Sequence, residues 1–587
     1  MKDVNSTSSV LGRWIIGVLD TFVLAVIVFF VAGNNVRVQI DLILATFILG
    51  VAGVLSVAAW RHGFRWFFSR RAWRFHAWFI VGVISVIVLF YAEESWRGKR
   101  AWAALQREAA ARGESLELSS VFPPSVPDDQ NFALAPGISM LLGYAHRAAS
   151  QAGASSDNEP ELLSFNERRQ FNRPAANWEF QQATDLAAWQ TFFRQHPLTN
   201  SAPASKTVSR LAFPVAAEPQ APAADVLLAL SRYDPALAVL RAANERPHVR
   251  YPIAYDDGLF ALNGGNAFDS GGLNTAVRIL CLRAVAELAQ NQSEAALQDT
   301  LLALRLADSL RQEPYQALHH SRAQMLRLCL QPVWEGLAHH RWNEAQLLTL
   351  EQRFAKLDLL AEFRVVARGE ALVMMNIADQ FQAFLDGRSS AWGRELASVE
   401  GGDRFWIWLF RVAYPVGWFY QDKVWIYRAY EQRADVVKAL DPASRSLWGI
   451  ENLQATDPAL LIMVAPRLRQ TFQEGAERAL YLQTACQAAT VACALDRCRL
   501  AQGQYPASLD ALVPAWLKQV PADLAVPGGT PLRYRREADG GFVLYSVGLN
   551  HVDDQGKPGL PQTDWRGVQS DSPRLDDGDW VWRQTGQ

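Results

Sequence analysis

Three apolar stretches near the start of the chain constrain its fold more than any other feature of its 587 residues. They cover residues 14–33, 42–60 and 76–92. A helix rises about 1.5 Å per residue, so about twenty apolar residues cross a hydrocarbon core of about 30 Å. The first two stretches reach that length, and the third is shorter and relies on flanking aromatic residues. We therefore expect three transmembrane helices within residues 1–95 and a lipid bilayer as a partner.

The arginines predict the orientation of these spans. The first loop has only Arg37, whereas the second loop holds Arg61, Arg65, Arg70, Arg71 and Arg74. Loops rich in Lys and Arg stay in the cytoplasm, so the second loop is expected inside. This places the N-terminus inside as well and everything after Ala92 outside. Asp20 interrupts the first apolar run, which is untypical of a cleaved signal peptide.

Composition excludes some classes of partner and site. The net charge of -2 and the lack of a basic stripe argue against nucleic-acid binding. Five cysteines are an odd number, and their spacing differs from that of a zinc site, so we expect them to be small buried hydrophobic residues. The chain shows no catalytic signature or cofactor motif, and the pairs His319-His320 and His339-His340 lack acidic or Cys partners at ligand spacing.

Beyond the spans we expect three further regions. Residues 96–225 are predicted to hold a juxtamembrane helix, a Pro-rich strap and an irregular segment. Residues 226–475 are predicted to form an α-helical domain of antiparallel hairpins, because apolar residues recur there at three- and four-residue spacing. The clearest helices are expected at 273–290, 294–311, 315–330 and 343–360. One hairpin, residues 282–309, resembles a tetratricopeptide-type unit with Ser293 as N-cap, without a second copy at the same period. Residues 476–587 have a different texture.

An unusual density of aromatic residues marks residues 405–430. Two interpretations remain open for this segment. It could form the packed core of a helical domain, or it could lie on the bilayer surface with Arg404, Arg411 and Lys423 reaching lipid phosphates.

The last hundred residues predict a small α+β module. A helix over 476–502 precedes two alternating runs, 531–536 and 542–547, and Asp539-Gly540-Gly541 between them is a hairpin signal. The segment carries a set of recurring motifs, Gly503-x-Tyr505-Pro506-x-Ser508-Leu509-x-x-Leu512, Pro521-x-Asp523, Leu532-x-Tyr534 and Leu544-Tyr545-Ser546-x-Gly548-x-Asn550. At these residues the chain resembles the globular part of the major pseudopilin of type II secretion systems. In a pseudopilin, the module follows one N-terminal helix directly, whereas three spans and some four hundred residues precede it here.

The resemblance implies a calcium site. In that family the loop after the last hairpin binds calcium, which takes six to eight oxygen ligands. The matching loop holds Asp553, Asp554 and Asp564. These three carboxylates are the candidate ligands, and solvated surface acids are the alternative interpretation.

Together these features predict a mainly α protein of the bacterial inner (cytoplasmic) membrane, with a large periplasmic or extracytoplasmic part. We expect a non-enzymatic scaffold that binds other envelope proteins in secretion or surface assembly. Two alternatives remain: a membrane sensor with a calcium-binding tail, and an envelope hydrolase with an acidic cleft. The acids available for that cleft are Asp128, Asp129, Asp256, Asp257 and Asp269.

Overall fold

The structure is a computed structural model that describes residues 70–142, 174, 176–197, 212–255, 270–388, 414–438, 465–526, 530–563 and 569–586. The fold is mainly α-helical, as the sequence predicts. The predicted spans at 14–33 and 42–60 lie outside the described residues.

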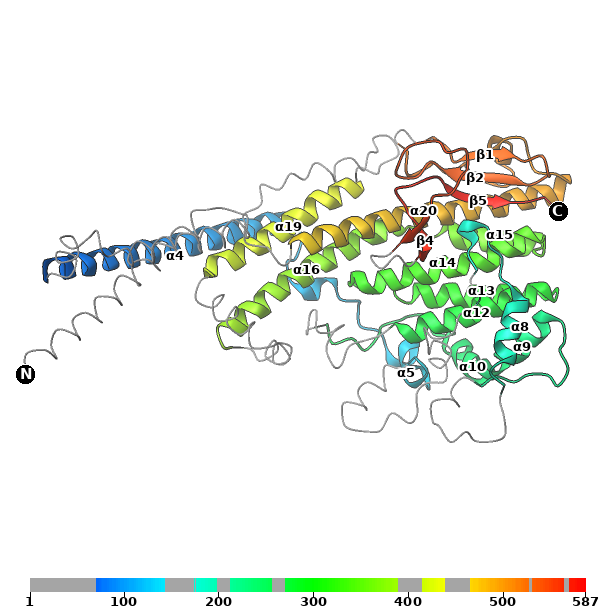
Figure 1. The fold of residues 1–587 in the computed structure, drawn as a ribbon, viewed down its shortest axis with the longest axis horizontal. Coiled ribbons are helices and arrows are strands. Elements are labelled where there is room, and N and C mark those ends of the chain that lie inside the picture. Colours follow the sequence, from blue (N-terminus) through cyan, green and yellow to red (C-terminus); the bar gives the residue numbers. More distant parts are fainter. Residues whose placement is uncertain are drawn as a thin grey trace, which may run out of the picture. The chain divides into compact units, whose positions relative to one another are not determined.

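Figure 1 shows the helices and strands in chain order. The helices are α4 (Arg70–Ala111), α5 (Ile138–Leu141), α8 (Leu186–Arg194), α9 (Pro222–Leu230), α10 (Asp234–Ala243), α12 (Gly271–Ala289), α13 (Ser293–Asp308), α14 (Gln316–Ala338), α15 (Glu344–Ala355), α16 (Leu359–Leu385), α19 (Val416–Lys438) and α20 (Ala465–Gln502). The strands are β1 (Arg533–Arg536), β2 (Phe542–Ser546), β3 (Pro561–Thr563), β4 (Gln569–Pro573) and β5 (Trp580–Gln584).

The chain divides into two compact units. Unit 1 contains residues 1–115, 377–428 and 454–468, and unit 2 contains 116–376, 429–453 and 469–587. The described helices of unit 1 are thus α4, the end of α16, the first half of α19 and the first turn of α20. Unit 2 holds the helical hairpins and all the described strands.

Helix α4 in unit 1 joins the third predicted span and the predicted juxtamembrane helix into one helix of 42 residues. The part of α4 from Trp73 onward is long and apolar enough to cross a membrane. Only 6% of its most apolar 18 residues are buried in the protein. The side chains of Trp78, Val86 and Leu89 are 75%, 65% and 68% exposed. Such a continuous apolar surface is unusual on a protein surface in water and typical of a lipid-facing helix.

Helices α4 and α19 approach each other closely just beyond this apolar window. A Cβ atom on Gly98 would lie 2.0 Å from the carbonyl oxygen of Gly417, and one on Gly417 would lie 1.9 Å from that of Glu94. Further along, Arg428 forms an ion pair with Glu108, so the two helices run in parallel. Only glycine allows backbones to approach so closely.

Polar contacts reinforce this crossing. The Glu94 carboxylate accepts hydrogen bonds from Trp418 Nε1 at 3.0 Å and from Gln421 Nε2 at 2.8 Å. Lys423 is buried, forms a 2.7 Å ion pair with Asp379 of α16, and lies 4.4 Å from the Trp102 ring centroid. Helices α4, α16 and α19 are therefore joined by charged and aromatic groups as well as by packing within unit 1.

The aromatic segment at 405–430 is described only from residue 414 onward. In that part Phe419 and Tyr427 are almost completely buried, in agreement with the packed-core interpretation. Residues 405–413 lie outside the described part, so contact of the segment with lipid is still a prediction.

Unit 2 is built on the helical hairpins that the apolar spacing predicts. Helix α12 packs on α13, α14 and α9. Helices α12 and α13 lie close to their predicted ranges, whereas α14 continues through Pro332 to Ala338. The helix predicted at 343–360 ends at Ala355 as α15, and α16 begins at Leu359. Burial of Val333, Trp334 and Leu337 offsets the hydrogen bond lost at the proline. The expected N-cap at Ser293 is wrong, because Gln292 occupies that position and makes no side-chain cap bond.

The C-terminal strands form the predicted Asp-Gly hairpin and add a third strand. The sheet order is β1-β2-β5, and both pairs are antiparallel. Gly540 in the turn has a φ of +87°, a conformation that favours glycine. The sheet packs on the hairpin layer: Trp334 Nε1 donates to the carbonyl of Arg583 at 2.9 Å, and the rings of Trp178 and Trp582 lie 5.3 Å apart.

Several residues of the pseudopilin-like motifs hold this module together. Ser546 Oγ donates to Asp523 Oδ1 at 2.7 Å, and the same oxygen accepts the backbone N–H of Ala525 at 3.0 Å. Tyr505 donates to Asp496 of α20 at 3.0 Å and packs edge-on against Phe542. These motif positions therefore have structural roles in this chain, and its likeness to a pseudopilin is still a resemblance.

The crossing of α4 and α19 makes a testable prediction. Replacing Gly417 by Ala forces the two backbones apart, and we expect a loss of at least about 2 kcal/mol of stability in unit 1. Gly82→Ala in α4 is the matched control, because nothing lies within 4 Å of its added Cβ. Thermal melting of the full-length protein in detergent micelles measures both. Equal melting temperatures for the two variants would show that the crossing is absent.

Candidate functional site

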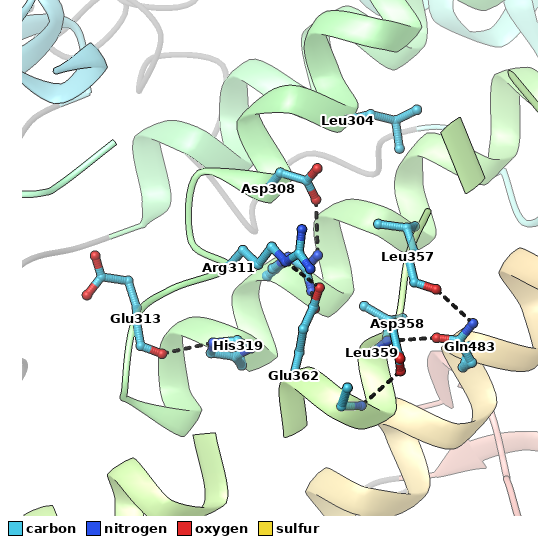
Figure 2. A network of polar contacts seen from close by, with 12 residues as sticks. Leu304, Asp308, Arg311, Glu313, His319, Leu357, Asp358, Leu359, Glu362 and Gln483 are labelled. Atoms are coloured by element: carbon cyan, nitrogen blue, oxygen red, sulfur yellow. Dashed lines mark hydrogen bonds and ion pairs between the residues drawn. The ribbon is translucent and has the colours of Figure 1, made fainter. Parts of the chain in front are cut away.

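A polar cluster in the described part of unit 2 lies among α13, α14, α15 and α16, and Figure 2 shows Asp308, Arg311 and Glu362 within it. Arg322 of α14 has a side chain only 3% exposed and pairs with Glu362 at 2.5 Å and with Asp308 at 3.0 Å. Arg311 reaches the other oxygen of Glu362 at 2.6 Å, and Arg353 pairs with Asp308. The cluster thus contains three guanidinium groups and two carboxylates.

Burial and charge oppose each other at these groups. Burial raises the pKa of Glu362, while the guanidinium groups of Arg322 and Arg311 oppose this rise. Removing ions from water costs several kcal/mol each, and only close opposite charges offset that cost. This arrangement joins four helices, and each guanidinium group and carboxylate in it forms at least one ion pair with another member of the cluster.

A second buried group lies beside it. The Tyr255 hydroxyl donates to the Glu313 carboxylate at 2.9 Å, and burial raises the pKa of Glu313 to about 7. Burial also lowers the pKa of His319 to about 3, so its imidazole is neutral near pH 7. Its Nε2 lies 2.9 Å from the backbone carbonyl of Glu313. Because a carbonyl only accepts, Nε2 must carry the proton.

The acids expected for an enzyme cleft are placed differently. Asp128 and Asp129 lie on the 3-10 helix η3 (Asp128–Gln130) and are exposed to solvent. Glu313, which is buried, is not one of the acids that the sequence suggested for the cleft. Asp256, Asp257 and Asp269 lie outside the described residues.

The candidate calcium ligands are only partly described. Asp553 accepts from the Tyr545 hydroxyl at 3.1 Å and pairs with Arg533 at 3.3 Å. Asp554 Oδ2 accepts a hydrogen bond from the Asn550 side-chain amide at 3.2 Å. Asp564 lies outside the described residues, and those that are described contain no group of three His, Cys, Asp or Glu residues able to hold a metal. The calcium site therefore stays a prediction that depends on Asp564.

An acid beyond the candidate set organises the same loop. Asp579 precedes β5, is 2% exposed, and accepts the backbone N–H groups of Gly556 at 2.6 Å and of Asp554 at 3.3 Å. Both of its carboxylate oxygens are thus engaged with backbone donors. Asp579, just before β5, thus holds the backbone of the loop that contains Asp553 and Asp554.

The cysteines are free and buried, as the sequence predicts. They are Cys281, Cys329, Cys486, Cys493 and Cys498. Burial raises the pKa of the Cys486 thiol to about 12 and also raises that of Cys329. Because the thiolate is the reactive form, these thiols are poor nucleophiles.

The sequence analysis missed Arg322, Glu362 and Glu313. A signal was available for Arg322, which occupies the same helical stripe as the buried residues Leu318, Leu326 and Cys329. A charged residue within an apolar stripe indicates a buried ion pair. Its partners could not be identified, because they come from other helices.

Comparison of this chain with protein-family models, with curated proteins and with solved structures finds no match.

The ion-pair cluster predicts unequal effects for two arginines that bind the same carboxylate. Arg322→Met leaves buried carboxylates without their central partner, and we expect a loss of about 3 kcal/mol. Arg311 is 50% exposed, so Arg311→Met should cost less than about 1 kcal/mol. Denaturant or thermal melting of the full-length protein in micelles compares the two. Equal losses would contradict the central role of Arg322.

The raised pKa of Glu313 predicts that the stability of the fold depends on pH. Its pKa is 4.5 in the unfolded chain and about 7 in the fold, so its contribution to stability is complete below pH 4.5 and is lost as the pH rises through 7. Glu313→Gln keeps an acceptor for Tyr255 but cannot titrate. Relative to wild type, this variant should gain up to about 3 kcal/mol between pH 5 and pH 8. Parallel pH profiles of wild type and variant would refute the assignment.

Proposed function

We propose that this chain is a membrane-anchored bacterial envelope protein that acts as a non-enzymatic scaffold in secretion or surface assembly. The observation that carries the proposal is the exposure of α4: the most apolar stretch of this helix is almost entirely unburied in the protein. Exposing that surface to water costs about 25 cal/mol of free energy per Å² of apolar area, whereas a bilayer accommodates it.

Tryptophans at the two ends of the apolar part of α4 support a crossing orientation. Trp78 and Trp96 are 75% and 59% exposed and eighteen residues apart, which is about 27 Å along a helix. That length is close to the thickness of a hydrocarbon core, and tryptophan favours both membrane interfaces. The Arg100 guanidinium lies 5.1 Å from the Trp96 ring centroid, as expected at a headgroup layer. Spans at 14–33 and 42–60 would complete the three-helix anchor.

The chemistry of unit 2 favours a scaffold over a catalyst. The Arg322 cluster uses buried charges to join helices, and the Tyr255–Glu313 hydrogen bond attaches residue 255 to the connection between α13 and α14. Hairpin helices of this kind commonly present faces to partner proteins, and the relatives suggested by the C-terminal motifs assemble by packing. With the second loop inside, unit 2 would lie on the periplasmic side of the inner membrane, where other envelope proteins are available.

Crosslinking in living cells tests this proposal. A cell-permeant crosslinker followed by affinity purification of the tagged full-length protein should recover defined envelope proteins. A variant with Lys at both Val86 and Leu89 serves as a control, because charged residues in the apolar window should weaken anchoring and reduce the crosslinks. Recovery of the protein alone under all conditions would count against a scaffold.

A further inference from the structure

A recess in unit 1 lies between the end of α16 and the start of α19. It is an open recess of about 290 Å³, lined by Gln382, Leu385, Asp386, Tyr414, Val416 and Phe419. Part of its wall is apolar, and its polar groups include one carboxylate. Its volume is large enough for a small polar group and the carbon chain attached to it.

The position of this recess along α4 can be fixed from contacts within the same unit. Val416 and Phe419 flank Gly417 and Trp418 in sequence, and Gly417 touches the backbone of Glu94. The Trp418 ring packs edge-on against Phe90 at 6.2 Å. Phe90 belongs to the predicted span at 76–92, so the recess lies at the level where α4 would leave the bilayer. This step rests on the proposed membrane anchoring.

One lining residue, Asp386, forms a 2.5 Å ion pair with Arg388, which is not itself part of the lining. Their side chains are 40% and 65% exposed. An exposed pair of this kind contributes little stability, so a ligand with the same two charges can replace it at low cost. The Tyr414 hydroxyl is already engaged, because it donates to buried Asp422 at 2.5 Å. Tyr414 therefore contributes its ring to the recess rather than a free hydroxyl.

We propose that this recess binds the headgroup of a zwitterionic phospholipid that carries a primary ammonium, as in phosphatidylethanolamine. The ammonium meets Asp386 and the rings of Tyr414 and Phe419, and the phosphate meets Arg388. Aromatic rings attract cations, and hydrogen bonds between charged groups are stronger than neutral ones. The acyl chains leave the recess past Leu385 and Val416 toward the bilayer.

The charge pattern distinguishes among headgroups. A primary ammonium donates three hydrogen bonds to carboxylate and amide oxygens, whereas a quaternary ammonium donates none. A purely anionic headgroup would satisfy Arg388 but leave Asp386 facing a like charge. The recess therefore favours phosphatidylethanolamine over both phosphatidylcholine and phosphatidylglycerol.

Lipid retention tests the proposal. The full-length protein is reconstituted in vesicles of equal parts phosphatidylethanolamine, phosphatidylcholine and phosphatidylglycerol and then extracted in mild detergent, and the copurified lipids are quantified by mass spectrometry. We expect phosphatidylethanolamine to be enriched over the vesicle composition. Asp386→Asn removes the negative charge that pairs with the ammonium, and Val416→Trp fills the recess. In this equal mixture the enrichment is at most about threefold, and each variant should lower it to about one, which is the value without lipid preference.

Glu93→Gln is the matched control, because Glu93 is an exposed carboxylate on α4 one residue from Glu94 and outside the recess lining. It should retain the enrichment. Melting of each variant in phosphatidylcholine and phosphatidylglycerol vesicles confirms that it is folded. Equal retention of the three lipids by wild type, or unchanged enrichment in both recess variants, would overturn the proposal.

Two further arms separate related explanations. Soluble O-phosphoethanolamine that stabilises the detergent-solubilised protein as strongly as the lipid would show that the ligand is a free metabolite, and this would overturn the lipid assignment. A protein that remains in the membrane fraction without lipid preference would contradict only this inference, whereas a protein absent from the membrane fraction would contradict the proposed function itself.

Discussion

The close contact between α4 and α19 is the constraint on which the account of unit 1 depends. Two glycines, Gly98 and Gly417, bring the backbones together, and Glu94 ties the start of α19 to the helix it crosses. The same helix, α4, carries an unburied apolar surface immediately before this crossing. A single continuous helix is therefore apolar and exposed enough to cross a membrane over one part of its length, and it packs against another helix over the next.

Unit 2 uses charge in a different way. Arg322 holds two carboxylates from neighbouring helices while almost completely removed from water. Such a cluster is costly to bury and adds little net stability over a well-packed apolar core, but it is strongly disfavoured in any other helix arrangement. We interpret it as a device that fixes the register of α13, α14, α15 and α16.

Much of the fold could be predicted from the sequence because local patterns determine it. Apolar spacing predicted α12 to α15, and Asp539-Gly540 predicted the β1–β2 turn. What depends on distant contacts could not be predicted. The contact of Gly417 with Glu94 joins residues more than three hundred positions apart, and the partners of Arg322 lie on other helices. Asp579, which organises the predicted calcium loop, is likewise far from that loop in sequence.

The central claim is that apolar helices near the N-terminus anchor this protein in a lipid bilayer. The most direct test is extraction of isolated membranes from cells that express the full-length chain, first with alkaline carbonate and then with detergent. Our account predicts that the protein stays in the pellet through the carbonate wash and is released only by detergent. Recovery of folded, full-length protein in the aqueous fraction without detergent would contradict it.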